Sequence, residues 1–221
     1  PRINEILGEQ LHQEFKVVYG KQERLQSTAK HTAYLKIAEG CSNRCTYCAI
    51  PLIRGGMNSY PIDDLLIEAI KLADNGVKEC VIIAQDTSRY GLDQGKSLLP
   101  KLLDELNKIE GFHWIRLLYQ YPDAISDEIL DAMKRNEKVL PYFDIPIQHA
   151  NNRLLKLMNR KGTKEDILRV VNKIRDVFPK AILRTTIIVG FPSETEEEFQ
   201  ELLDFVDEIK FDRLGAFTYS D

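Results

Sequence analysis

Short apolar runs alternate with longer amphipathic segments from about residue 31 to the end of the chain. The apolar runs predict six β-strands, over residues 34–38, 81–84, 114–118, 142–147, 182–189 and 213–218. Apolar residues at helical spacing predict helices between them, over residues 63–75, 98–109, 126–134, 163–178 and 194–209. Strands that alternate with helices in this way are typical of a parallel sheet covered by helices.

Six such units are too few to close the eight-stranded TIM barrel. We therefore expect an α/β fold in the form of an open, partial (βα)6 TIM-like barrel, with a curved parallel sheet of six strands and helices outside it. Ligands of such folds bind at the carboxyl ends of the strands. The residues that follow each strand are accordingly the candidates for chemistry.

Composition narrows the class of protein. The chain has 221 residues and a net charge of -4, with lysine and arginine spread along it, so we expect no direct nucleic-acid binding by this segment. No apolar run approaches the roughly 20 residues of a membrane span. Residues 1–30 are polar without an apolar period and predict a lead-in, whereas residues 31–221 predict one folded domain. Because the chain starts at Pro1 and stops after a strand, we expect an excised domain.

Three of the four cysteines, Cys41, Cys45 and Cys48, directly follow the first predicted strand. Three thiolates this close in sequence can surround one metal centre. A four-iron cluster usually takes four protein thiolates, so three would leave one iron open for another ligand. The fourth cysteine, Cys80, lies in an apolar strand and is expected in the core. Without a signal peptide, reduced cysteines and a cytoplasmic protein are expected.

Three other interpretations of the cysteines remain open. They could be reduced thiols in a loop that binds no metal. A structural zinc site needs four ligands, usually in two separated pairs, and the sequence offers no fourth. A passive iron–sulfur domain for electron transfer would hold a cluster but bind no cofactor at the other strand ends.

Polar residues follow several other strands. Gln85, Asp86 and Thr87 come after the second strand, and Gln148 comes after the fourth. Arg184 lies inside the fifth strand, where a buried cation needs a partner: either the carboxylate of a ligand or a structural acid. These residues are poor core material, which favours a site at this edge of the sheet.

The cysteine spacing, with Tyr47 just before the last thiol, resembles that of the radical S-adenosylmethionine enzymes. Several runs together resemble one branch of that superfamily, the methylthiotransferases. The matching runs are residues 39–51 (EGCSNRCTYCAIP), 54–55, 146–151 (PIQHAN), 155–160 (LKLMNR) and 188–195 (IVGFPSET). Residues 85–88 and 90–91 look like the group that modifies a small-subunit ribosomal protein. The alternative is the tRNA-adenosine methylthiotransferase group, which usually has Asn and Val at the positions of Asp86 and Thr87.

The resemblance implies two cofactors. A [4Fe–4S] cluster on Cys41, Cys45 and Cys48 would bind S-adenosylmethionine at its open iron and generate a 5′-deoxyadenosyl radical. By the same resemblance, the cofactor contacts are expected from these residues: Tyr47 and Gly190 near the adenine, Gln85, Asp86 and Thr87 at the amino group, Gln148 at the ribose, and Arg184 at the carboxylate.

The resemblance also implies a reaction and its partners. In the full enzyme, an aspartate β-carbon of the ribosomal protein would be methylthiolated, with a flavodoxin or ferredoxin as reductant and the enzyme acting as a monomer. Family members carry an N-terminal domain with a second cluster and a C-terminal substrate-binding domain. We expect this chain to be the central catalytic domain, with both of those domains missing.

Overall fold

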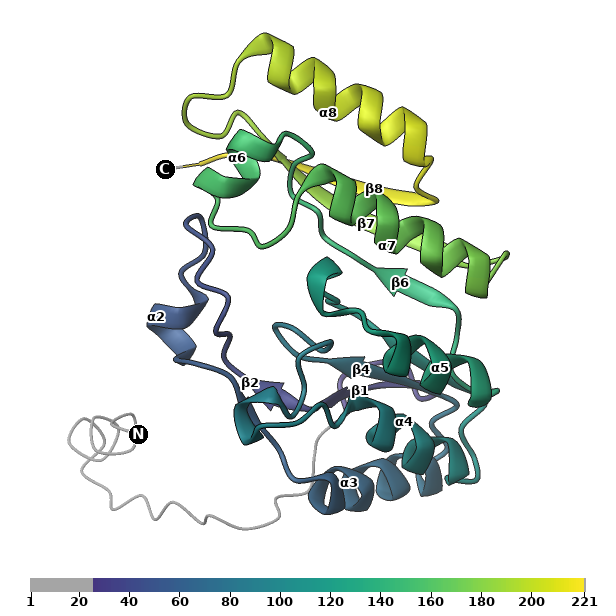
Figure 1. The fold of residues 1–221 in the computed structure, drawn as a ribbon. Coiled ribbons are helices and arrows are strands. Elements are labelled where there is room, and N and C mark those ends of the chain that lie inside the picture. The colour runs from purple at the N-terminus through teal and green to yellow at the C-terminus, as the bar shows by residue number, and fades with distance from the viewer. Residues whose placement is uncertain (1–25, 221) are drawn as a thin grey trace, which may run out of the picture.

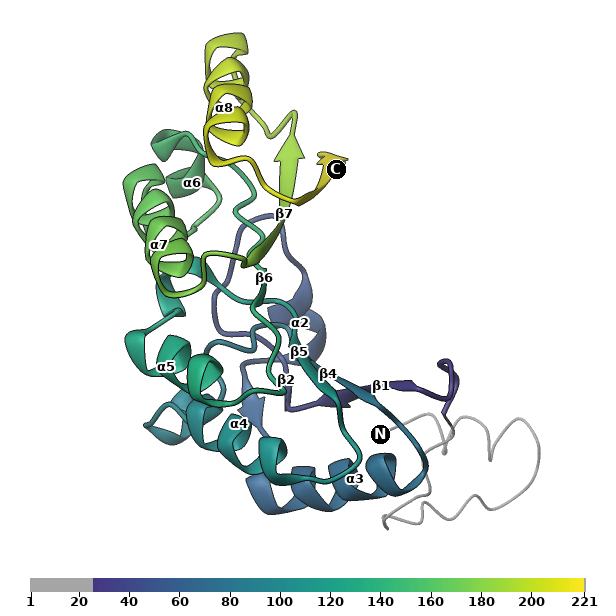
Figure 2. The same cartoon turned by 90° about the vertical axis from the view of Figure 1, so that its right-hand side faces the viewer.

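Helices cover the outer face of a curved layer of parallel strands in the computed structural model, which describes residues 26–220 (Figure 1). Figure 2 shows the same layer edge-on, with α4, α5, α7 and α8 on one side of it. The lead-in predicted over residues 1–30 falls mostly outside the described residues. Within them, the first strand begins at Thr32.

Six strands form two parallel sheets of three. The first has the order β1-β4-β5 and the second the order β6-β7-β8. The strands are β1 (Thr32–Lys36), β4 (Glu79–Ile83), β5 (Trp114–Leu117), β6 (Tyr142–Asp144), β7 (Ile182–Val189) and β8 (Arg213–Thr218). All six predicted strands are therefore present, and each of the four pairings within the two sheets is parallel.

Continuous pairing is interrupted between β5 and β6, where we expected a single six-stranded sheet. A single parallel β-bridge, between Ile115 in β5 and Val139 shortly before β6, connects the two sheets. Pro141 has no N–H to donate to a ladder, and Tyr119 leaves the extended conformation with φ 58°. Beyond the gap the strands meet again, because the Gln120 N–H donates to the Asp144 carbonyl at 2.8 Å.

The longer helices follow the predicted apolar period. The helices are α2 (Ile50–Arg54), α3 (Ile62–Asp74), α4 (Leu99–Lys108), α5 (Asp127–Arg135), α6 (Asn152–Leu157), α7 (Lys164–Val177) and α8 (Glu196–Ile209), with 3₁₀ turns at Leu92–Gln94 and Pro122–Ala124. Thr163 and Asp166 form a capping box at the start of α7. Among residues 26–220, no helix has the length and apolar character needed to cross a bilayer.

The core lies between the helices and the strands. Strand β4 is buried on both sides at its centre, and Cys80 is fully buried there, as predicted. Strand β8 is largely exposed, as expected of an edge. This burial fixes the strand positions, and so it fixes where the loops at their carboxyl ends meet.

The apolar pattern did not predict two short helices, α2 and α6, or a small antiparallel pair of strands. Strand β2 (Ala38–Glu39) pairs antiparallel with β3 (Asn58–Ser59) and closes the long loop that holds the three cysteines. Helix α2 lies inside that loop and buries none of its residues. Because helix prediction rests on a buried face, an exposed single turn leaves nothing to detect.

Candidate functional site

A pocket of about 580 Å³ opens at the carboxyl ends of the strands. All three candidate cysteines line it, as do Gln85, Asp86, Gln148 and Arg184. Tyr47 lines it too. The residues that the sequence placed at separate strand ends are thus brought together in one cavity, as the carboxyl-end rule predicts.

The cysteine loop begins with a turn that only glycine can make. Gly40 has φ +75°, and a Cβ on it would lie 2.3 Å from the Gly56 carbonyl oxygen. The Cys41 N–H donates to the Gly55 carbonyl at 3.2 Å. The start of the loop is therefore packed directly against the backbone at its end.

Asp86 ties the middle of the cysteine loop to the end of β4. Its carboxylate accepts from Asn43 Nδ2 at 2.8 Å and from Ser88 Oγ at 2.6 Å. Arg89 Nε lies 3.1 Å from the same carboxylate. Burial raises the pKa of Asp86, while the hydrogen bonds from Ser88 and Asn43 oppose that rise. Asp86 thus holds the loop in place through its side-chain contacts while lining the pocket.

A second tie comes from the turn that follows α6. The Thr46 N–H donates to the Met158 carbonyl at 3.1 Å, and Thr46 Oγ1 donates to the Leu157 carbonyl at 3.0 Å. Asn159 Nδ2 donates to the Arg44 carbonyl at 2.8 Å. Both Arg44 and Asn159 are left-handed. The loop is held from two sides, so the positions of its thiols are set by distant parts of the chain.

The three thiols share the pocket without forming a compact ligand set for one ion. Within residues 26–220, no group of three His, Cys, Asp or Glu side chains lies close enough to hold a metal ion. Ligands of a four-iron cluster bind different irons, and thiols spread around one cavity suit that requirement. Burial raises the pKa of Cys41, with the Asp86 carboxylate and the neighbouring thiols adding to the rise.

Two glutamines give the cavity unsatisfied polar atoms. Gln85 Oε1 is buried without a partner, and so are both side-chain polar atoms of Gln120. Gln120 is only 1 % exposed, yet it lines the pocket. Unpaired buried amides are costly unless something binds them. A polar ligand with donors and acceptors, such as the amino-acid part of S-adenosylmethionine, fits this wall.

Arg184 pairs with a structural acid, which is one of the two kinds of partner that the sequence left open. Its Nη1 lies 2.6 Å from Asp144 Oδ1, and Asp144 is 1 % exposed. The Tyr119 N–H donates to the other carboxylate oxygen at 3.1 Å. This pair sits at the gap between β5 and β6. Arg184 still lines the pocket, so its contact with a cofactor carboxylate stays a prediction.

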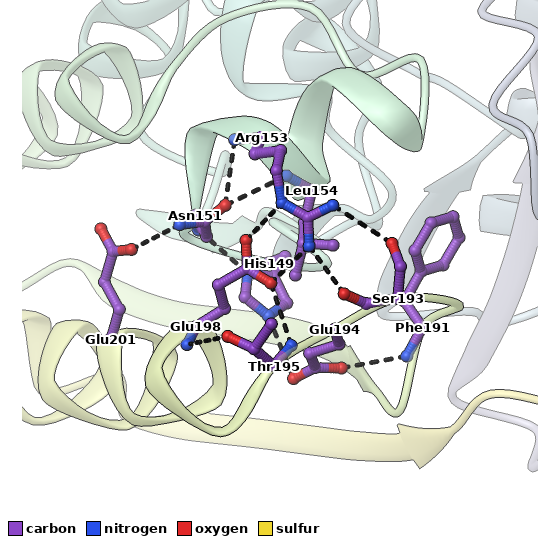
Figure 3. A network of polar contacts seen from close by, with 10 residues as sticks. All are labelled: His149, Asn151, Arg153, Leu154, Phe191, Ser193, Glu194, Thr195, Glu198 and Glu201. Atoms are coloured by element: carbon purple, nitrogen blue, oxygen red, sulfur yellow. Dashed lines mark hydrogen bonds and ion pairs between the residues drawn. The ribbon is translucent and has the colours of Figure 1, made fainter.

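Gln148 reaches the pocket through a left-handed backbone conformation, with φ 70°. The next residue, His149, is fully buried and turns away (Figure 3). The Asn151 N–H donates to His149 Nδ1 at 2.9 Å, so Nε2 carries the proton and donates to Glu194 at 3.3 Å. Burial lowers the pKa of His149, and Glu194 partly opposes this.

The rest of this network ties the same loop to α8. Asn151 Nδ2 donates to Glu201 at 2.6 Å, and Arg153 pairs with Glu198 at 2.6 Å (Figure 3). The Arg153 guanidinium also donates to the Ser193 carbonyl at 2.7 Å. The network therefore locks the loop after β6 to the loop after β7, and it fixes the backbone that presents Gln148.

Two predicted contacts have a different place in the structure. Thr87 is fully buried and does not line the pocket, because its hydroxyl donates to the Leu118 carbonyl at 2.8 Å. Gly190 has φ +73° and also lies outside the pocket lining. A Cβ on Gly190 would meet no atom within 4 Å. Its proposed closeness to adenine stays a prediction.

Among the residues that line the pocket but were not predicted as site residues are Gln120, Tyr121, Asp144 and Arg160. Gln120 and Tyr121 follow the third strand, where the position relative to the strand end was an available signal. Arg160 lies in a turn after a helix, far from any strand end in sequence. Its membership of the run LKLMNR was the available signal.

The comparisons with known proteins agree with this geometry. The family model described as "Radical SAM superfamily" matches residues 35–206, and the chain belongs to this superfamily. A curated relative from Clostridioides difficile (strain 630), "Ribosomal protein uS12 methylthiotransferase RimO", is 60% identical over 198 residues. That alignment covers 89% of this chain and 45% of the relative, so the chain spans less than half the length of the curated relatives it matches.

Solved structures show the same fold. The radical S-adenosylmethionine methyltransferase TsrM from Kitasatospora setae, with cobalamin and a [4Fe-4S] cluster bound, matches with a TM-score of 0.70 at 17% identity. The match covers 85% of this chain and 36% of TsrM. Streptococcus suis SuiB bound to S-adenosylmethionine matches with a TM-score of 0.59 at 19% identity, over 86% of this chain and 41% of SuiB.

Proposed function

We propose that this chain is the catalytic domain of a radical S-adenosylmethionine methylthiotransferase. Cys41, Cys45 and Cys48 would hold a [4Fe–4S] cluster, and the unpaired amides of Gln85 and Gln120 would meet S-adenosylmethionine beside it. The observation that carries the proposal is this pairing, in one cavity, of three thiols with buried polar atoms that lack partners.

The bound cluster would supply one electron to S-adenosylmethionine and so produce a 5′-deoxyadenosyl radical. The chain's own residues have other tasks. Asp86 and the turn after α6 hold the thiol loop in place. Gln148 and Arg184 present polar groups to the cavity from the opposite sheet. Tyr47 and Tyr121 shield the thiols from water, which protects reactive species from side reactions.

For the substrate, we propose an aspartate side chain of a small-subunit ribosomal protein. This rests on the curated relative's name, at 60% identity, and on the run at residues 85–91. We further propose that the enzyme acts in the cytoplasm as a monomer, with a flavodoxin or ferredoxin as reductant. Thr87 does not line the pocket, so it would not read the substrate by direct contact.

Sulfur delivery would require chain beyond this sequence. Three of the four cysteines are committed to one cluster, and Cys80 is fully buried in β4. We therefore place the sulfur-donating centre in the remaining length of the relatives. This chain alone should cleave S-adenosylmethionine and yet add no methylthio group to the ribosomal protein, as mass spectrometry of the treated substrate would show.

Anaerobic reconstitution tests the proposal. We expect about four irons and four sulfides per chain, and slow formation of 5′-deoxyadenosine after reduction. Cys45→Ala should lose the iron, whereas Cys80→Ala is the matched control and should keep it. Iron that survives Cys45→Ala, or stoichiometric zinc in place of iron, would contradict the proposal. Iron without any 5′-deoxyadenosine would favour a passive electron-transfer domain.

A further inference from the structure

Arg160 is a buried cation with no acidic partner. It is 9 % exposed, and no carboxylate among residues 26–220 forms an ion pair with it. Its Nη2 donates to the Pro146 carbonyl at 2.5 Å, and its Nη1 lies 3.4 Å from Tyr47 Oη. Burying a charge costs several kcal/mol unless something compensates it. A carbonyl and a phenol compensate only part of a full positive charge.

Two other cations that line this pocket, Arg184 and Lys36, differ from Arg160. Arg184 pairs with Asp144 at 2.6 Å. Lys36 pairs with Glu39. Arg160 alone of these three presents its charge to the cavity without an acid beside it. Its charge is therefore available to an anionic group that enters the site.

Arg160 is one side chain away from a candidate cluster ligand. Its guanidinium carbon lies 4.0 Å from the centroid of the Tyr121 ring. The hydroxyl of Tyr121 lies 3.7 Å from Cys45 Sγ. The Arg160 guanidinium also interacts electrostatically with Tyr47, Tyr121 and Cys45. The cation, the aromatic ring and the thiol thus form one continuous contact chain.

The backbone of this residue is fixed by the turn that also holds the cysteine loop. The Arg160 N–H donates to the Leu155 carbonyl at 2.8 Å, and Asn159 contacts the Arg44 carbonyl. The cation and the thiol loop are therefore held to the same short segment.

We propose that Arg160 is a positioning residue that supplies the buried counter-charge for the cluster held by Cys41, Cys45 and Cys48. The inference rests on the proposed cluster site. Three thiolates make such a centre anionic, and an added electron makes it more so. A fixed positive charge nearby stabilises the reduced form, because net charge and hydrogen bonds set the potential of iron–sulfur centres. The guanidinium stays protonated throughout.

The test measures the midpoint potential of the cluster in the reconstituted full chain. Electron paramagnetic resonance monitors the reduced cluster during a redox titration without S-adenosylmethionine. At a fixed solution potential, Arg160→Gln should lower the ratio of reduced to oxidised cluster about tenfold, which is 59 mV for a one-electron couple. Arg160→Lys keeps the charge and should stay close to the wild type. Arg169→Gln, on the exposed face of α7, removes the same charge elsewhere and is the matched control.

Each outcome decides the matter. If Arg160→Gln has the potential of Arg169→Gln, the inference is overturned while the cluster stands. If Arg160→Gln fails to fold or to load iron, Arg160→Lys decides: a wild-type potential supports the counter-charge, and a shifted potential or lost iron refutes it. A wild-type chain that takes up no iron overturns the proposed function, and this inference with it.

Discussion

Two strand ends in this molecule use the same two-residue arrangement with opposite chemistry. After β4, both Gln85 and Asp86 line the pocket, and the Asp86 carboxylate also holds the cysteine loop. Past β6, Gln148 lines the pocket while His149 turns away to hold the loop after β7. One tie is a carboxylate and the other a neutral imidazole. In each pair the glutamine lines the pocket, and the next residue makes the side-chain contacts that hold a neighbouring loop.

The two residues differ in the number and kind of contacts through which each holds its loop. Asp86 joins two hydrogen-bond donors and one guanidinium. His149 makes one bond as an acceptor and one as a donor, so its tie depends on a single tautomer. The tie beside the thiols therefore has more partners, and the tie on the opposite wall depends on the neutral form of the imidazole ring.

The largest effect is expected from Asp86→Ala. Asn43 and Ser88 would lose their acceptor in a buried site, which should lower the free energy of unfolding by about 3 kcal/mol. Arg89 keeps Asp123 as a partner at 2.6 Å, so its charge stays compensated. Chemical denaturation measures the change. Asp74→Ala, on the exposed end of α3, is the control, and an equal effect there would refute the role of Asp86.

A smaller loss is expected from His149→Ala. The variant leaves the Asn151 N–H and Glu194 Oε1 without their partner, at a cost of about 2 kcal/mol, while Glu194 Oε2 keeps the Phe191 N–H. His149→Gln retains one acceptor and one donor and should recover part of the loss. Denaturation of the two variants side by side gives the comparison. Equal losses in both would show that ring packing, and not the hydrogen bonds, is what matters.

The imidazole tie also predicts a pH dependence. The folded pKa of His149 is lowered below its usual 6.5 by burial. The unfolded chain therefore binds a proton at a higher pH than the folded chain does. The stability that comes from the neutral ring is complete above about pH 6.5 and is lost as the pH falls through the folded value.

Denaturation measured from about pH 7.5 to about pH 5, a range that brackets the usual pKa of histidine, tests this loss of stability. The carboxylates of Glu194, Glu198 and Glu201 act in the opposite direction to burial, because each of them raises the pKa of His149. The wild type should lose more stability over this interval than His149→Gln, which cannot take up the proton. Parallel curves for the two proteins would remove His149 as the cause.

The smallest expected effects separate the wall from the ligand surface. Thr87→Val removes the hydroxyl that donates to Leu118 and should cost about 1 kcal/mol of stability, with cofactor binding unchanged. Gln85→Leu should leave stability unchanged, because Gln85 Oε1 has no partner to lose. It should weaken binding of S-adenosylmethionine to the reconstituted chain about tenfold, or 1.4 kcal/mol. If Thr87→Val instead weakened cofactor binding and Gln85→Leu instead lowered stability, the roles assigned to the two residues would be exchanged.

Sequence patterns located the strands, the longer helices and the cysteine loop because burial imposes a period on them. They could not tell which polar residue at a strand end faces the cavity. Gln85, Asp86 and Thr87 are consecutive and equally polar, yet only the first two line the pocket. Arg160 was missed for a different reason. Its contact with Tyr121 joins two segments whose proximity depends on the whole curvature of the sheet.

The clamp on the cysteine loop has a consequence for the order of events during synthesis. Asn159 holds the Arg44 carbonyl across 115 residues of chain. A ribosome that adds about 5–20 residues per second needs roughly 6–23 s to cover that distance. For that interval the thiols exist on a loop whose final shape is not yet imposed. Cluster assembly on the finished geometry must therefore wait until the turn after α6 has emerged, and thiols that load earlier do so on an unclamped loop.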